Sequence, residues 1–173
     1  LYFSKKGWFL VGCEIPIVMP PNKQYNNVVY QGYLDVVLYH EPTNKFYIID
    51  IKTSTKGWNA QAKKDEIKQF QLILYKKYFS EQFGVPLEDI DIEFFIVKRK
   101  LYENLDFPQK RVQIFKPPSG KVKLNRATKA IDDFINESFT KSGYKEREFQ
   151  QNPSKWNCRF CPFSDNPELC DKS

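Results

Sequence analysis

The sequence predicts an α/β fold in which a mixed β-sheet is flanked by helices, and three observations lead to this prediction. Apolar, β-branched runs with turn-rich links occupy residues 8–52, which is typical of three strands in an antiparallel meander. The hydrophobic period then becomes helical over about residues 59–83. Two further strand-like runs and a second helical stretch follow, so the order βββ-α-β-β-α indicates a layered α/β domain.

The first three strands are predicted by their composition and by the turn signals between them. The first covers residues 8–19 and is interrupted or ended near Pro16. A link rich in proline and asparagine leads to the second strand at about 28–39. Residues 40–44 then read as a hairpin-type loop, and residues 45–52 as the third strand.

The remaining elements follow from the change of period. One long helix is predicted over about 59–83, and the Gly-Val-Pro sequence at 84–86 ends it. An apolar strand is expected at about 91–100 and a shorter one near 111–115. A proline-rich turn introduces a second helix at about 121–140. We therefore expect the long helix to pack across the sheet.

Length and composition indicate one globular domain. The chain has 173 residues, of which 41% are hydrophobic and 16% aromatic, which excludes a disordered protein. No apolar run reaches the roughly 20 residues that a membrane helix needs. Residues 1–142 are expected to form the core and 143–173 a cysteine-containing tail packed on it. The net charge of +6 fits either a solvated surface or an electrostatic footprint for nucleic acid.

Two acids and one lysine stand inside the apolar strands. Asp35 follows Gly32-Tyr-Leu, and Asp50 precedes Ile51 and Lys52. Burying such charges costs on the order of several kcal/mol unless they are paired. Carboxylate oxygens suit a hard cation such as Mg²⁺, and a lysine beside it can hold a water and offset phosphate charge. The combination predicts metal-assisted phosphodiester hydrolysis.

Three ordered motifs resemble a known family. They are Gly32-Tyr-Leu-Asp35, Ile49-Asp-Ile-Lys-Thr-Ser54 and Gln71-Leu-Ile-Leu-Tyr75. Together they are similar to the PD-(D/E)XK nuclease superfamily, and within it to the RecB-like exonuclease branch. The resemblance spans about residues 8–116 and implies a restriction-endonuclease-like core.

The resemblance also implies roles for individual residues. Asp35 and Asp50 would bind one or two Mg²⁺ or Mn²⁺ ions, with the Ile51 carbonyl completing the shell. Lys52 would position or activate the attacking water. Glu14 is a candidate third metal-binding acid, although a surface glutamate would look the same in the sequence.

Four further residues are candidates for substrate binding. Gln71 and Tyr75 are one helical turn apart, and in the family this face contacts substrate; the alternative is the polar edge of an ordinary amphipathic helix. Thr53 and Ser54 are placed to hold a phosphate or, equally, to end the strand or cap a helix. His40 lies in a predicted turn and is not expected to bind metal.

The C-terminal cysteines form a separate signal. Cys158 and Cys161 make a C-x-x-C pair and Cys170 follows, a spacing that suits Zn²⁺ or an iron–sulfur cluster. The tail resembles that of the AddB and CRISPR-adaptation nucleases, although the gap before Cys170 is longer. Cys13 is either an unusual fourth ligand or, in our preferred interpretation, a buried thiol. Free cysteines are the alternative to a metal site.

The prediction from these features is an intracellular, Mg²⁺- or Mn²⁺-dependent deoxyribonuclease, and an exonuclease because the Gln-x-x-x-Tyr helix marks the branch that processes DNA ends. Recombination, repair or replication is the expected setting, with a phage as a candidate source and a helicase or recombination protein as a candidate partner. The alternatives are a structure-selective endonuclease or RNA-directed nuclease, a DNA-binding module that does not cleave, and a zinc-ribbon interaction protein. Lys63-Lys64 and Lys98-Arg99-Lys100, with Trp58 and Tyr102, are candidates to line a channel for single-stranded DNA.

Overall fold

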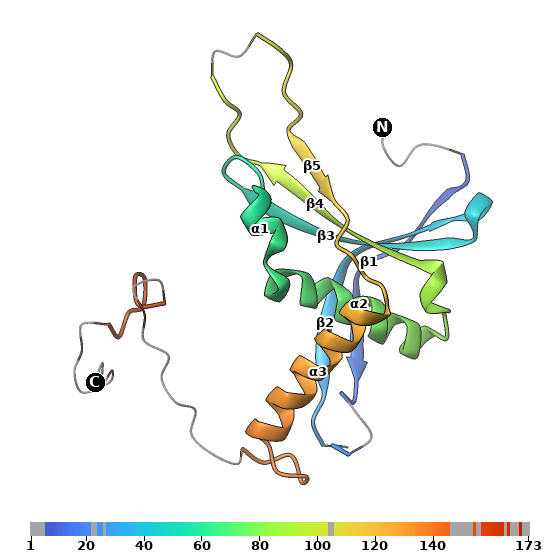
Figure 1. Cartoon of the computed structure of the whole chain (residues 1–173). Helices are drawn as coiled ribbons and strands as arrows, with labels where there is room; N and C mark the ends of the chain where they lie inside the picture. The colour runs from blue at the N-terminus through green and yellow to red at the C-terminus, as the bar shows by residue number, and fades with distance from the viewer. Residues whose placement is uncertain are drawn as a thin grey trace.

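The fold is a five-stranded mixed sheet with helices packed on it, in a computed structural model that describes residues 6–21, 24–25, 27–103, 106–145, 154, 157–164, 166 and 170. The strands lie in the order of the chain (Figure 1). Neighbours are antiparallel except for the third and fourth strands, which are parallel. The predicted α/β fold with a mixed sheet is therefore confirmed. The strands are β1 (Trp8–Met19), β2 (Tyr30–His40), β3 (Lys45–Ser54), β4 (Ile90–Lys98) and β5 (Val112–Phe115).

The helix α2 (Glu66–Phe83) crosses one face of the sheet and buries the core beneath it (Figure 1). Its Leu72, Ile73 and Tyr78 are fully buried. A second long helix, α3 (Lys121–Ser138), packs on α2 through residues that include the buried Ala127. Short 3₁₀ turns stand at Glu41–Thr43 and Leu87–Asp89. The sheet side of the core consists of Ile17, Leu34, Val37, Ile48, Ile90, Ile92, Phe94 and Ile96.

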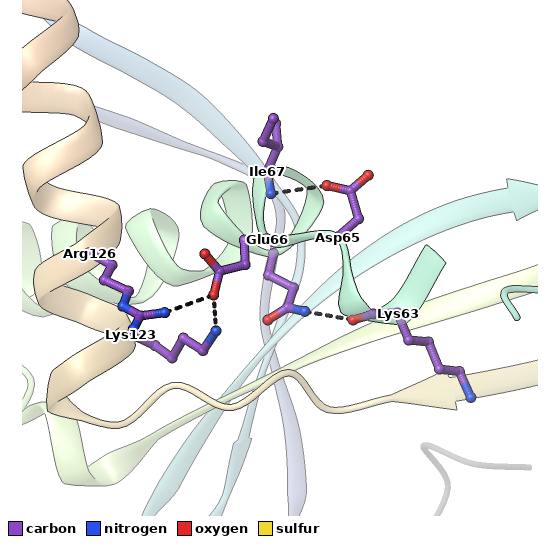
Figure 2. A network of polar contacts seen from close by, with 7 residues as sticks. Lys63, Asp65, Glu66, Ile67, Lys123 and Arg126 are labelled. Carbon is purple, nitrogen blue, oxygen red and sulfur yellow. Dashed lines mark hydrogen bonds and ion pairs between the residues drawn. The ribbon is translucent and has the colours of Figure 1, made fainter. Parts of the chain in front are cut away.

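The helix predicted over 59–83 is broken into α1 (Ala60–Lys64) and α2 by Asp65. The Asp65 backbone is extended, and its carboxylate accepts a hydrogen bond from the Ile67 N–H at 3.1 Å (Figure 2). Aspartate is a favoured N-cap because it satisfies such a free helix donor. The Lys63 carbonyl, left free at the end of α1, accepts from Gln69 Nε2 at 2.6 Å. The break thus leaves few backbone groups unpaired.

The first turn of α2 is tied to α3 by charge. The Glu66 carboxylate contacts the ammonium of Lys123 and lies 3.2 Å from a guanidinium nitrogen of Arg126 (Figure 2). These partners lower the pKa of Glu66, with the Lys123 hydrogen bond as the largest cause. At the other end of α3, Tyr25 donates to the Asn136 side chain at 2.8 Å. Contacts at both ends therefore fix the position of α3.

The first strand covers the predicted residues 8–19, but Pro16 neither interrupts nor ends it, contrary to the prediction. β1 runs on to Met19, and its irregularity is a register shift between Leu10 and Gly12. A proline is tolerated here because β1 is an edge strand. Gln82 of α2 reaches this edge: its Oε1 accepts from the Val18 N–H at 2.9 Å, and its Nε2 donates to the Pro16 carbonyl at 3.0 Å.

The other boundaries differ from the predictions by one or two residues. β2 begins at Tyr30 and β3 extends to Ser54, while α3 ends at Ser138, where Phe139 forms a bridge with Lys145. In the tail, residues 157–164 form consecutive turns. That the tail packs on the core stays a prediction. No helix in the described part of the chain combines the length and apolar character needed to cross a membrane.

Candidate active site

The sheet divides where the motif acids lie. β2 pairs with β3 only as far as Val36 and Ile49. Beyond that point the earlier residues of β2 pair with β1 alone, whereas the later residues of β3 pair with β4. Figure 1 shows the β1–β2 pair leaving the other three strands here. Asp35 and Asp50 are the next residues along the two strands, so this fork brings both to one place.

Asp35 takes over a backbone partner at the fork. Its Oδ2 accepts a hydrogen bond from the Ile51 N–H at 2.6 Å. The N–H and C=O of one residue in a strand point to the same edge, so the Ile51 carbonyl also faces the fork. The carboxylate and the carbonyl that the resemblance assigns to metal binding therefore lie on one side of β3.

Asp50 and Lys52 form an ion pair within β3. Alternate residues share a face of a strand, and the Lys52 Nζ lies 3.1 Å from Oδ1 and 2.9 Å from Oδ2 of Asp50. Only the contact to Oδ1 has the geometry of a hydrogen bond; the buried Oδ2 makes none within the described residues. Burial raises the pKa of the Asp50 carboxyl, and the Asp35 charge adds to this, while Lys52 acts in the opposite direction.

Gln71 and Tyr75 continue this network from α2. The Lys52 ammonium donates to Gln71 Oε1 at 3.1 Å, and Gln71 Nε2 donates to the Tyr75 hydroxyl at 3.1 Å. The Tyr75 ring is only 7% exposed and packs against Gly32, where an added Cβ would lie 2.6 Å from Tyr75 Cε1. Substrate contact by Tyr75 has no support from this buried position. Gln71 instead contacts the Lys52 ammonium and Tyr75 contacts Gln71, so both belong to the network that holds Lys52.

The residues at the fork fit a divalent cation. The charge of Asp35 acts unfavourably on the Asp50 carboxylate. The buried Asp50 Oδ2 accepts no hydrogen bond within the described residues, and the Ile51 carbonyl faces the same place. All are hard oxygen ligands. Among the residues that the structure describes, no group of three or more His, Cys, Asp and Glu side chains could hold a metal. That Asp35, Asp50 and the Ile51 carbonyl bind one stays a prediction.

Glu14 is near the fork but outside this set. Its neighbours in β1 pair with Val36 and Leu34, so the register puts Glu14 across from Asp35. Its backbone is left-handed, with φ 52°, which is uncommon for residues other than glycine. The side chain is exposed. A metal-binding role for Glu14 stays a prediction.

The hydroxyl residues after Lys52 differ in what they contact. The Ser54 hydroxyl donates to the Gly57 carbonyl at 2.9 Å and so closes the turn that follows β3, the structural role considered in the sequence analysis. Thr53 is exposed. The His40 Nδ1 lies 2.8 Å from the Thr43 hydroxyl in the 3₁₀ turn.

The C-terminal C-x-x-C segment forms a turn. Cys161 donates its N–H to the Cys158 carbonyl at 3.2 Å. Among the described residues, Cys158, Cys161 and Cys170 belong to no group of side chains that could hold a metal. The preferred interpretation of Cys13 was wrong: it is exposed on the edge strand, beside a hollow of about 240 Å³. The hollow is lined also by Trp8, Leu10 and Leu38, and a strand pattern alone does not reveal which face of a sheet stays uncovered.

Comparison with known proteins gives the family. A sequence model of the PD-(D/E)XK nuclease superfamily matches residues 3–166. No curated protein matches the chain. One solved structure, the crystal structure of SSO0001, is similar over 92% of this chain with 17% identity and a TM-score of 0.48, and this chain spans 61% of its length. With nearly the whole chain matched and the acids of its motifs meeting at the fork of the sheet, the protein belongs to the PD-(D/E)XK nuclease superfamily.

Proposed function

We propose that this chain is a divalent-metal-dependent deoxyribonuclease that hydrolyses phosphodiester bonds, and that it acts on DNA ends. One observation carries the proposal: Asp35, Asp50 and Lys52 converge at the fork of the sheet, with Lys52 held between Asp50 and Gln71. Recombination, repair or replication is the setting that suits such an activity, with a helicase or recombination protein as a candidate partner.

The residues at the fork would share the work as follows. Asp35, Asp50 and the Ile51 carbonyl would hold Mg²⁺ or Mn²⁺, which supplies Lewis acidity toward the scissile phosphate. Lys52 is 35% exposed at its side chain, so its ammonium can reach both Asp50 and a bound phosphate or water. The contact with Gln71 restricts its orientation, and a fixed cation lowers the cost of charge that develops on phosphate oxygens.

The Gln71–Tyr75 pair, in which Tyr75 is buried, supports this assignment of Lys52. A flexible lysine loses side-chain entropy when it is held in one place. Here two acceptors on different elements already hold it, so less ordering remains to be done during the reaction. We propose exonuclease rather than endonuclease action on the family resemblance of the Gln-x-x-x-Tyr helix alone.

The test is digestion of end-labelled linear DNA and of closed circular DNA, with Mg²⁺, Mn²⁺ or EDTA. We expect release of labelled nucleotides from linear DNA in either metal, no reaction in EDTA, and no reaction with Asp50→Asn. The matched control is Asp133→Asn, which removes an exposed carboxylate on α3. Nicking of the circular DNA would mean that the protein is an endonuclease and not an exonuclease. DNA binding without cleavage would mean that it is a binding module and not a nuclease.

A metal at the C-terminal cysteines is a separate proposal. It rests on the C-x-x-C spacing and on the turn at Cys158–Cys161, and takes Zn²⁺ or an iron–sulfur cluster as its occupant. It has no part in the chemistry at the fork.

A further inference from the structure

A group of cations stands where β3 leaves the site, and the proposed chemistry does not use it. The group, here called the basic arm, comes from the loop after β3 and from the two limbs of the β4–β5 hairpin. Figure 1 shows this hairpin projecting from the sheet beyond β3 and α1. Its members are Lys56, Lys98, Arg99, Lys100 and Arg111.

Backbone hydrogen bonds hold the basic arm to the catalytic strand. The Arg99 N–H donates to the Ser54 carbonyl and the Lys100 N–H to the Thr55 carbonyl, both at 2.8 Å. Ser54 is two residues from Lys52, so the position of these cations relative to the fork is set by main-chain bonds. Across the hairpin, the Lys98 N–H donates to the Arg111 carbonyl at 2.9 Å, and Arg111 Nη1 donates to the Lys98 carbonyl at 3.0 Å.

The charges of the basic arm are not compensated by acids. Elsewhere, lysines such as Lys45, Lys77 and Lys129 lie within 4.0 Å of a carboxylate. Within the described part of the chain, no member of the basic arm has such a partner. Arg99 instead donates to the Thr55 hydroxyl at 3.1 Å, a neutral acceptor. Adjacent uncompensated cations repel one another, and a polyanion relieves that repulsion.

Exposed aromatic rings accompany these cations. Tyr102 is 53% exposed and Phe107 65% exposed on the same hairpin. The Lys56 ammonium lies 4.4 Å from the centre of the Tyr102 ring. By contrast, Trp58 packs against Phe94 and belongs to the core. Rings interleaved with uncompensated cations are the pattern of a surface on which unpaired bases stack while the phosphates are held.

We propose that the basic arm binds a single-stranded segment of DNA and leads it to the fork of the sheet. Its cations contact phosphates, and Tyr102 stacks with a base. This deepens the proposed nuclease function and rests on it, because the strand held by the arm is the one presented to Asp50 and Lys52.

The test is binding of fluorescein-labelled oligothymidine in EDTA, followed by anisotropy at increasing salt. The variant Lys56→Gln/Lys100→Gln removes two exposed charges of the arm, and Lys121→Gln/Lys141→Gln removes two exposed charges outside it. Losing two phosphate contacts should make the negative slope of log K against log salt shallower by about 1.4. The wild type should then lose about sevenfold more affinity than the arm variant between about 50 and 200 mM salt. The control should keep the wild-type slope.

Tyr102→Leu tests the stacking separately. It should weaken binding of the single strand without changing the salt slope, since it removes a ring and no charge. An unchanged slope in the arm variant, or the same change in the control, would overturn the arm. Equal binding of a duplex together with full affinity in Tyr102→Leu would overturn the single-strand assignment. Wild-type binding with the full slope but no cleavage in Mg²⁺ would refute the nuclease and leave the arm intact.

Discussion

Gly32→Ala tests the packing that positions the site. A Cβ at this residue would lie 2.6 Å from Cε1 and 3.3 Å from Cζ of the Tyr75 ring. Two non-bonded carbons prefer a separation of about 3.5–4.0 Å, so the ring or β2 would have to move by roughly 1 Å. Tyr75 is 7% exposed on α2, and little space is open to it. Forcing a methyl group into such packing typically costs about 1–3 kcal/mol.

Without this clash the same substitution should stabilise. The φ of Gly32 is outside the left-handed region, and a glycine replaced by alanine under such conditions stabilises by about 0.4–1 kcal/mol through the unfolded state. The sign of the change therefore reports the contact with Tyr75. Urea denaturation measures it, and the rate of DNA cleavage reports whether the displaced ring disturbs Gln71 and Lys52. We expect lower stability and slower cleavage together.

Two variants of Tyr75 make the argument refutable. Tyr75→Phe keeps the ring, so Gly32→Ala should still destabilise in that background. Tyr75→Leu removes the atoms that clash, so Gly32→Ala should become neutral or stabilising there, and the coupling between the two positions should exceed about 1 kcal/mol. A stabilised Gly32→Ala protein, or the same cost in both backgrounds, would mean that the ring does not set the requirement for glycine.

Lys52→Met should slow single-turnover DNA cleavage by at least about a hundredfold, the lower limit for a group that positions or moves a proton. Lys52→Arg is the matched variant that keeps the charge. Cleavage at the wild-type rate in Lys52→Met would contradict the catalytic role of Lys52. Glu66→Gln should lower the urea midpoint at pH 7, because the lowered pKa of Glu66 beside Lys123 and Arg126 means that its carboxylate stabilises the fold above its unfolded pKa. That difference should vanish as the pH falls through the folded pKa, and a gap that persists in acid would contradict the ion pair. The purified chain should contain zinc or iron that Cys158→Ser loses, as measured by elemental analysis, whereas a metal-free wild type would mean free thiols.

The sequence was sufficient for the architecture and for the convergence of two acids on neighbouring strands. Strand runs, the change of period and the motif order predicted the mixed sheet, and charges set among β-branched residues pointed to Asp35, Asp50 and Lys52, of which only Asp50 is buried. These signals work because burying an unpaired charge is costly wherever the chain folds. The break at Asp65 was also readable, since an aspartate is a favoured N-cap of a new helix, but the hydrophobic period runs through it.

Other features depend on what lies across space. Pro16 seemed to end a strand, and only the edge position of β1 explains why it does not. The role of Gln71 depends on the distance between α2 and β3, and a single sequence contains no record of that distance. Gly32 offered one usable signal: a glycine inside an apolar strand often marks close approach of another group, here the Tyr75 ring.

The amide of Gln82 on the outer side of β1 has a consequence for self-association. A sheet grows when the free main-chain groups of its last strand pair with another polypeptide, and β1 is long and bears exposed apolar residues such as Leu10 and Val18. At Val18 and Pro16 those groups are already engaged by a side chain from the helix below. A neighbouring molecule would have to displace that amide to extend the sheet at this point, so the terminal strand is closed there to intermolecular pairing.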